Sequence, residues 1–172
     1  STLRLHGGGT VQTAADVTLF QGEVTFEDNI ALYAPKIILL DNSYLGFDGV
    51  STSDLINLGG KLEPSGRDVG EFTLNGDLIN MEKRNPTGNL VGSIGFDIQG
   101  TSQGVNYDAL IVFGAADMAC SIDLKWGGDY TASAGDTFDL VVADTSSGSP
   151  SLVYSSGLPS NLAIRWANPS AF

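Results

Sequence analysis

The sequence predicts an all-β fold, and three observations support this prediction. Short segments of alternating apolar and polar residues recur along the chain, and many of them end at a polar residue followed by glycine or asparagine. No long stretch has apolar residues spaced three and four apart, as an amphipathic helix requires. Glycine occurs 22 times in 172 residues, without the period of collagen. Short strands joined by tight turns account for all three observations.

The predicted strands follow one another along the whole chain. They are residues 2–6, 16–20, 23–26, 36–40, 44–47, 54–58, 71–74, 93–98, 109–113, 121–126 and 137–142. In the first of these, Leu3 and Leu5 alternate with Thr2 and Arg4, so both leucines lie on one side of the strand. Loops are expected at 83–89 and 145–151, where proline, glycine and small polar residues gather, and an irregular tail is expected at 167–172.

Two all-β architectures fit strands of this length: a β-solenoid, and a β-sandwich or jelly roll. Gly22 and Gly46 are 24 residues apart, and so are Gly76 and Gly100, which matches a solenoid turn of roughly 20–25 residues. This spacing favours the solenoid, and the sandwich or jelly roll stays as the alternative. We expect one all-β domain over 1–172, with N-terminal strands in 1–71, solenoid repeats in 72–144, and terminal strands with the tail in 145–172.

The composition argues against several classes of partner. Eight basic and twenty acidic residues give a formal charge of −12, and only Lys83 and Arg84 are adjacent among the basic ones. Without a basic stripe, nucleic acid is not an expected partner. No apolar run is long enough to cross a membrane, so no membrane insertion is expected. A high negative charge favours solubility and the binding of divalent cations outside cells.

The second half of the chain carries an ordered set of turn and strand residues. They are Leu74, Gly76, Asp77 and Leu78, then Gly100, Thr101, Gly104, Tyr107, Asp108, Leu110, Val112 and Gly114, and finally Ala134, Gly135, Asp136, Thr137 and Phe138. Over about 72–144 this set resembles the C-terminal region of secreted bacterial β-solenoid surface proteins, of the autotransporter passenger and adhesin type. The resemblance implies a right-handed parallel β-helix, an extracellular or cell-surface location, and a structural or adhesive function without catalytic residues.

Within this set we expect corners and core positions. The corner and core residues are Gly76, Asp77, Gly100, Gly104, Tyr107, Asp108, Gly114, Gly135 and Asp136. Glycine allows backbone angles that other residues avoid, so it suits a hard corner. Tyr107 is expected to lie over the neighbouring turn of the solenoid, and Asp108 to cap exposed backbone amides at a corner.

Catalytic and metal chemistry have few candidates. His6 is the only histidine and lies next to three glycines, with no nucleophile motif, and Cys120 is the only cysteine and sits in an alternating run. We therefore predict no catalytic residues and no cofactor, with calcium as the one exception. Its weak candidate ligands are Asp28, Asp41, Asp136 and Asp139, which lie at expected turns.

These observations predict an extracellular structural protein, either a surface adhesin segment or the subunit of a self-assembling filament, and not an enzyme. The expected partner is another copy of the chain, with a surface glycan as a second partner. Thr2, Leu3, Arg4 and Leu5 are the candidates for self-assembly, because an edge strand can pair with a neighbour. The alternatives are a carbohydrate-active β-helix enzyme, a lyase or hydrolase, and a glycan-binding module such as a piece of a phage tail fibre. The scattered basic residues argue against the enzyme.

Overall fold

The structure is a computed structural model that describes residues 1–66, 68–81, 92–127, 129–150 and 152–156, with side chains up to residue 150. The expected loop 83–89 and tail 167–172 lie outside the described residues. Strands and turns make up the described part of the chain, which confirms the all-β prediction. It contains no helix of the length and hydropathy that a membrane span needs.

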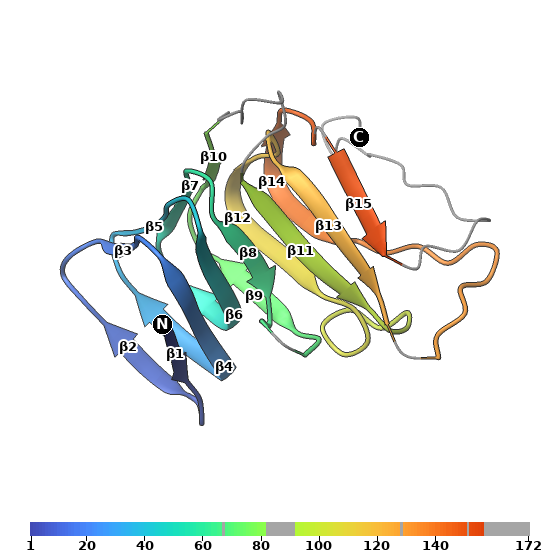
Figure 1. The fold of residues 1–172 in the computed structure, drawn as a ribbon, viewed down its shortest axis with the longest axis horizontal. Helices are drawn as coiled ribbons and strands as arrows, with labels where there is room; N and C mark the ends of the chain where they lie inside the picture. The colour runs from blue at the N-terminus through green and yellow to red at the C-terminus, as the bar shows by residue number, and fades with distance from the viewer. Residues whose placement is uncertain (67, 82–91, 128, 151, 157–172) are drawn as a thin grey trace.

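Fifteen strands follow one another along the chain (Figure 1). They are β1 (Thr2–Leu5), β2 (Gly9–Gln12), β3 (Val17–Leu19), β4 (Gly22–Tyr33), β5 (Lys36–Leu39), β6 (Ser43–Ser51), β7 (Asp54–Asn57), β8 (Lys61–Pro64), β9 (Glu71–Leu74), β10 (Leu78–Asn80), β11 (Ser93–Ile98), β12 (Ala109–Asp117), β13 (Ser121–Trp126), β14 (Val141–Ser147) and β15 (Leu152–Ser156).

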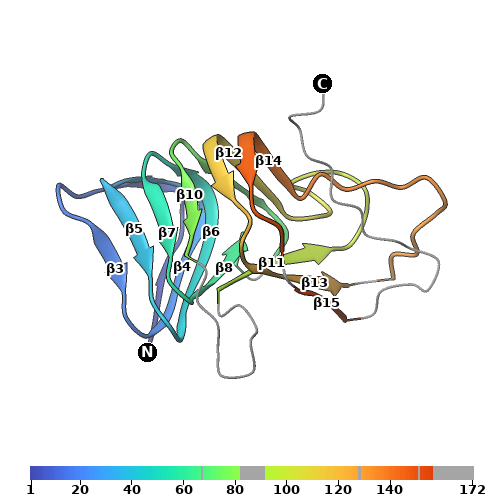
Figure 2. The same cartoon turned by 90° about the horizontal axis from the view of Figure 1, so that it is seen from above.

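Every ladder between these strands is parallel, and the ladders form three faces (Figure 2). Face 1 contains β1, the first halves of β4 and β6, then β8, β11, β13 and β15. Face 2 contains β2, the second halves of β4 and β6, then β9 and the first halves of β12 and β14. Face 3 contains β3, β5, β7, β10 and the second halves of β12 and β14. This arrangement is consistent with a β-solenoid, whereas a sandwich or jelly roll needs antiparallel ladders.

The 24-residue glycine spacing in the sequence does not mark the repeat. Gly22 pairs with Ser43, and Gly46 pairs with Thr25, so the two glycines occupy different positions in their turns. The true spacing on face 1 varies: Leu45 pairs with Leu62 after 17 residues, whereas Leu62 pairs with Ile94 after 32. Insertions between the strands therefore hide the repeat, and the predicted period is wrong.

Several strand boundaries also differ from the predictions. β2, β8 and β10 were not predicted, because GTVQ and KLEP each contain a single large apolar residue and LIN has only three residues, so none of them shows alternation. The last predicted strand, 137–142, instead begins at Val141 and continues to Ser147, into the loop predicted for 145–151. Phe138 still packs against the core from the segment before β14.

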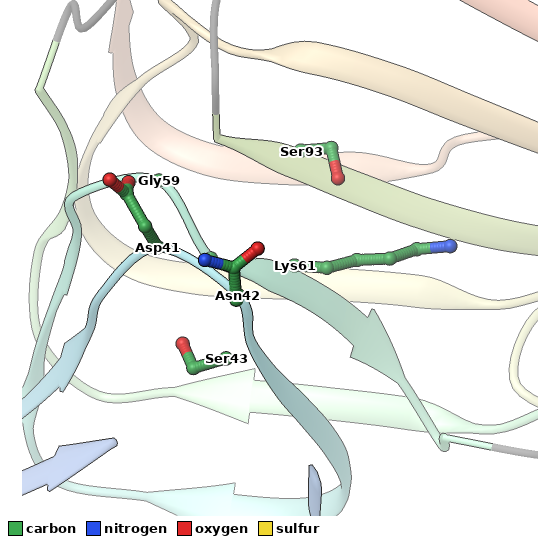
Figure 3. A pocket seen from close by; sticks show the side chains of 7 residues that line it. Asp41, Asn42, Ser43, Gly59, Lys61 and Ser93 are labelled. Carbon is green, nitrogen blue, oxygen red and sulfur yellow. The ribbon is translucent and has the colours of Figure 1, made fainter. Parts of the chain in front are cut away.

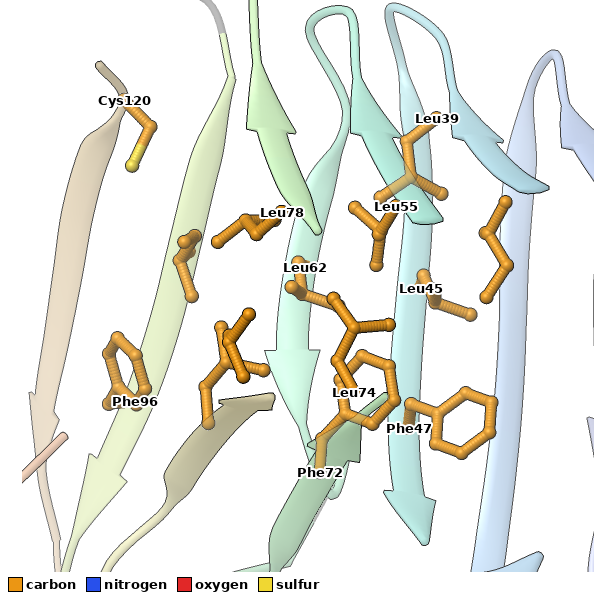
Figure 4. Close-up of a cluster of buried hydrophobic side chains, with 14 of the residues drawn as sticks. Leu39, Leu45, Phe47, Leu55, Leu62, Phe72, Leu74, Leu78, Phe96 and Cys120 are labelled. Carbon is orange, nitrogen blue, oxygen red and sulfur yellow. The ribbon is translucent and has the colours of Figure 1, made fainter. Parts of the chain in front are cut away.

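The core fills the space between the three faces (Figure 4). Along face 1, Leu45, Leu62 and Ile94 pair in register and are fully buried. Phe47 on face 1 stacks on Phe72 of face 2, with ring centroids 4.4 Å apart. Since each inward row is continued by the next turn, side chains of like shape pack on one another along the axis.

Candidate functional site

The ion pairs found among the described residues gather on the outer surface of face 1. Five side chains, Tyr44, Lys61, Glu63, Asp97 and Lys125, form what we call the Glu63 cluster. They come from β6, β8, β11 and β13, whose alternate residues point into the core. The parallel register brings them together, because Tyr44 pairs with Lys61 and Asp97 with Lys125.

Glu63 holds the centre of the cluster and is only 4% exposed. Its Oε1 lies 2.7 Å from Lys125 Nζ and 2.8 Å from Lys61 Nζ. The Tyr44 hydroxyl donates to Oε2 of the same carboxylate and lies 2.7 Å from the Gly66 carbonyl oxygen. Lys125 is also 3.6 Å from Asp97, so the contacts of Glu63 and Lys125 link four turns of the chain.

Two glycines allow close approaches around this buried carboxylate. Gly46 pairs with Glu63 on one side, and a Cβ at Gly46 would lie 2.5 Å from Gly66 Cα. On the other side, a Cβ at Gly95 would lie 2.7 Å from Glu63 Oε1. Gly95 therefore has to lack a side chain so that the Glu63 side chain can lie over it, whereas Gly46 has to lack one so that the Gly66 backbone can approach.

The electrostatics of the cluster keep Glu63 ionised. Burial opposes its charge, but hydrogen bonds from Lys125, Lys61 and Tyr44 outweigh burial and lower the pKa of Glu63. Burial, together with the hydrogen bond to Glu63, raises the pKa of Tyr44. At neutral pH, Tyr44 is thus a donor to a permanent carboxylate.

The pKa values of two further members of the cluster, Asp97 and Lys125, are both raised. Burial raises the pKa of Asp97, against the opposing charge of Lys125. Burial disfavours the charge of Lys125, but its contacts with Glu63 outweigh this effect and raise the pKa of Lys125. The Lys125 side chain keeps 45% of its surface exposed and borders a shallow hollow with Tyr44, Asp97 and Gly66.

This arrangement suits cross-linking of turns better than catalysis. A general base or nucleophile must reach its substrate. Both carboxylate oxygens of Glu63 already accept hydrogen bonds, Oε1 from Lys125 and Oε2 from Tyr44, so neither is free to act on a substrate. The Lys125 ammonium remains partly open to the hollow and can donate hydrogen bonds to a hydroxyl-rich ligand, whereas the Tyr44 hydroxyl proton is already donated to Glu63.

A second hollow lies beside the cluster and contains one of the calcium candidates (Figure 3). Asp41 is the only carboxylate among its lining residues, and Lys61 extends away from Asp41 and Asn42. The other candidates lie in separate turns: Asp28 in the bulge of β4, and Asp136 and Asp139 before β14. Within the part of the chain that is described, no three His, Cys, Asp or Glu residues lie close enough to share a metal ion.

Asp108 lies at a corner and binds backbone amides there. Its carboxylate is 1% exposed and accepts from the N–H of Gly70 at 2.9 Å and of Asp97 at 2.7 Å, and from the Ser65 hydroxyl at 3.0 Å. Gly70 belongs to the preceding turn, so one side chain joins two turns. Burial raises the pKa of Asp108 to about 7, although these three hydrogen bonds act in the opposite direction.

The corner between faces 2 and 3 uses Gly76, Asp77 and Gly114. A Cβ at Gly76 would lie 2.2 Å from Ser53 O, and one at Gly114 would lie 2.6 Å from Gly76 O. The turns therefore approach too closely for any larger residue. Asp54 accepts from the amide of Asp77 at 3.1 Å, and Asp77 accepts from the amide of the next turn at Ala115, at 2.8 Å.

The other predicted corner residues lie in the two longer connections. Gly100 and Gly104 belong to the loop between β11 and β12, where Gly104 has φ +66° and donates to Tyr107 O. The Tyr107 ring is buried and meets Phe138 edge-on at 5.3 Å. Before β14, Gly135 has φ +103°, and Asp136 accepts from Ser133 N and from the Tyr130 hydroxyl.

The self-assembly candidates Thr2, Leu3, Arg4 and Leu5 form β1. Among the described strands, β1 pairs only with β4, so its second edge carries no strand. Leu3 occupies the inward row of Val24, Leu45 and Leu62 but is 54% exposed.

The sequence did not reveal the Glu63 cluster. The eight basic residues are scattered along the chain, yet the fold brings Lys61 and Lys125 onto one carboxylate. The strands that hold Asp97 and Lys125 were predicted, but their register was not. Gly46 and Gly95, at outward positions inside strands, are the one local signal, since a glycine there indicates a close approach by another group.

No family model, no curated protein and no solved structure matches this chain. The likeness to autotransporter passenger domains and adhesins therefore stays an expectation from the residues that carry it.

Proposed function

We propose that this protein is a structural component of an extracellular or cell-surface assembly, as an adhesin segment or filament subunit. In this proposal the chain forms a right-handed parallel β-helix that serves as a shaft. The all-parallel ladders and the three continuous faces support such a shaft. The two buried carboxylates with shifted pKa values support it as well, because Glu63 and Asp108 both form hydrogen bonds that join one turn to another.

The single observation that carries the proposal is the open end of the core at β1. Leu3 is 54% exposed, whereas Leu45, Leu62 and Ile94 in the same row are fully buried. An exposed core row beside a free strand edge is completed when a further parallel strand adds to it. We propose that a second copy of the chain supplies this strand, so that copies add along the axis of the shaft.

A proline at the edge tests this proposal. Glu23 donates to Ser1 O, so Ser1, Leu3 and Leu5 direct their backbone groups to β4, and Thr2 and Arg4 direct theirs to the free edge. Arg4→Pro removes one free N–H without removing a bond to β4. Electron microscopy of the wild type is expected to show filaments with a fixed repeat. Arg4→Pro and a chain lacking residues 1–9 are expected to give short particles, and Arg4→Gln is the matched control that keeps the N–H. Filaments that survive both changes would refute assembly through β1.

Glycan binding is a second candidate function, favoured by the shallow hollow that Tyr44, Asp97 and Lys125 border. Its side chains combine a tyrosine ring, a lysine and a carboxylate, which are the groups that recognise sugar hydroxyls. Glu23, Glu63 and Asp97 outnumber Lys125 around the hollow, so neutral sugars are expected rather than acidic ones. Saturable binding of a neutral oligosaccharide that is lost in Tyr44→Ala would support this function. We propose no catalytic activity, because Glu63 is enclosed.

A further inference from the structure

The outer surface of face 3 carries two apolar rows that cross four turns of the chain. In the first row Ile38, Ile56 and Ile79 pair in register, and Thr18, its one polar member, pairs with Ile38; all four point away from the core. The second row follows two residues later in each turn, with Phe20, Leu40, Leu58 and Met81. Backbone bonds extend the ladders to this row, from Leu40 N to Leu19 O, Leu58 N to Leu39 O and Met81 N to Asn57 O, at 3.0, 2.7 and 3.1 Å.

These strands are apolar on both sides, unlike those of face 1. Ile37, Leu39, Leu55 and Leu78 fill the core from the inner side. Outside, Phe20 is 72% exposed, Met81 58% and Ile79 37%, with Ile38 and Ile56 half-buried. Strands that are apolar on both sides are typical of sheets covered on both sides, whereas a sheet that faces water alternates. This pattern indicates that face 3 is covered in the working form of the protein.

Charge selects the kind of partner that fits. None of the eight positions in the two rows is charged, in a chain with a net charge of −12. A cationic partner would gain nothing on this surface, whereas two copies of an acidic chain repel each other least where both are neutral. The exposed side-chain surface of the two rows amounts to roughly 500 Å² per chain, taking about 200 Å² for a large apolar side chain. Two such surfaces bury about 1,000 Å² in total, the lower limit for a specific interface.

We propose that face 3 packs against face 3 of a second copy, with the two apolar rows of each chain in contact across a two-fold axis. Such a contact uses the same surface on both chains and closes on itself as a dimer. It lies on the side of the shaft, so it joins shafts laterally and does not depend on strand addition at β1. Interfaces at this lower limit of area are typical of transient contacts, so the dimer is expected to form reversibly.

Sedimentation equilibrium over a wide range of concentrations tests this proposal, in an Arg4→Pro background that removes axial addition. The unmodified face 3 is expected to give a reversible monomer–dimer equilibrium. Ile79→Lys places an unpaired ammonium in the contact and is expected to weaken dimerisation at least ~10-fold. Val50→Lys is the matched control, because Val50 on face 2 also points outward and is also 37% exposed. Phe20→Ser is a second disrupting change, at a position too exposed to affect folding.

The possible results distinguish between a second copy of the chain, a lipid surface and no partner on face 3. Dimerisation that is lost in Ile79→Lys and Phe20→Ser, but kept in Val50→Lys, supports the proposal. A monomer at every concentration overturns it, and so does a dimer that Ile79→Lys leaves unchanged. A monomer that sediments with phosphatidylcholine vesicles, in a manner that Ile79→Lys abolishes, also overturns it and assigns the face to a lipid surface. Arg4→Pro keeps face 3 intact, so a failure of axial assembly is distinguishable from a failure of this dimer.

Discussion

The Glu63 cluster gives the sharpest stability prediction. Glu63→Ala removes a carboxylate that is 4% exposed, and leaves Lys61, Lys125 and the Tyr44 hydroxyl without this acceptor. Breaking a fully buried ion pair by removing one partner costs about 3–5 kcal/mol. The two lysine side chains are 31% and 45% exposed, so water recovers part of their solvation, and the cost here is expected to fall to about 2–3 kcal/mol. For a chain of this length, that corresponds to a fall in melting temperature of about 5–10 °C.

Two matched variants test whether the burial of Glu63 is the reason for this destabilisation. Glu63→Gln keeps the shape and a hydrogen bond to Tyr44 but loses the charge, so we expect about half the effect. Asp123→Asn removes a carboxylate that contacts Lys61 at 3.3 Å but is 38% exposed, and is expected to cost no more than about 0.5 kcal/mol. Urea unfolding followed by circular dichroism measures all three. If Glu63→Ala costs less than about 0.5 kcal/mol, or Asp123→Asn costs as much as Glu63→Ala, the reasoning from burial is wrong.

Three further predictions concern the corners and the core. The folded pKa of Asp108, about 7, lies above its unfolded value, so its contribution to the unfolding free energy is complete below about pH 4 and is lost as the pH rises through 7. Wild type relative to Asp108→Asn should thus lose roughly 2.5 kcal/mol between pH 5 and 8 in urea titrations, and an unchanged difference would contradict the raised pKa. Gly114→Ala should destabilise by about 1–3 kcal/mol in the same assay, because its Cβ would meet Gly76 O at 2.6 Å, whereas Gly127→Ala, whose Cβ would meet only a flexible glutamine at 3.3 Å, should be nearly neutral. Cys120 is fully buried with its pKa raised by burial to about 12, so a thiol reagent should label it at least ~100-fold faster in urea than in buffer, and fast labelling of the native chain would refute its burial.

Local pattern alone was enough to predict the strands and many of the corners. Alternation is a property of four to six neighbouring residues, and it predicted β5, β7, β9, β11 and β13 to within a residue or two. Gly76 and Gly114 were predicted as corner residues because glycine allows unusual backbone angles, whereas the structure needs glycine there because the neighbouring turn approaches closely. The continuous apolar run from Ile37 to Leu40 is also evident in the sequence. Only the stacking of the turns shows that Ile38 and Leu40 point outward and align with apolar residues of the neighbouring turns.

The register between turns was decided by tertiary structure. Turns of 17 to 32 residues on face 1 share one register, because the loops between strands absorb the differences in length and the core rows set the alignment. For that reason the sequence could not predict that Lys61 and Lys125 both contact Glu63, since Lys125 and Glu63 lie 62 residues apart in the chain. Nor could it predict that the apolar residues of face 3 align in rows. Charge and hydropathy along the chain determined what kind of fold and surface this protein has, and the stacking of its turns determined which residues meet.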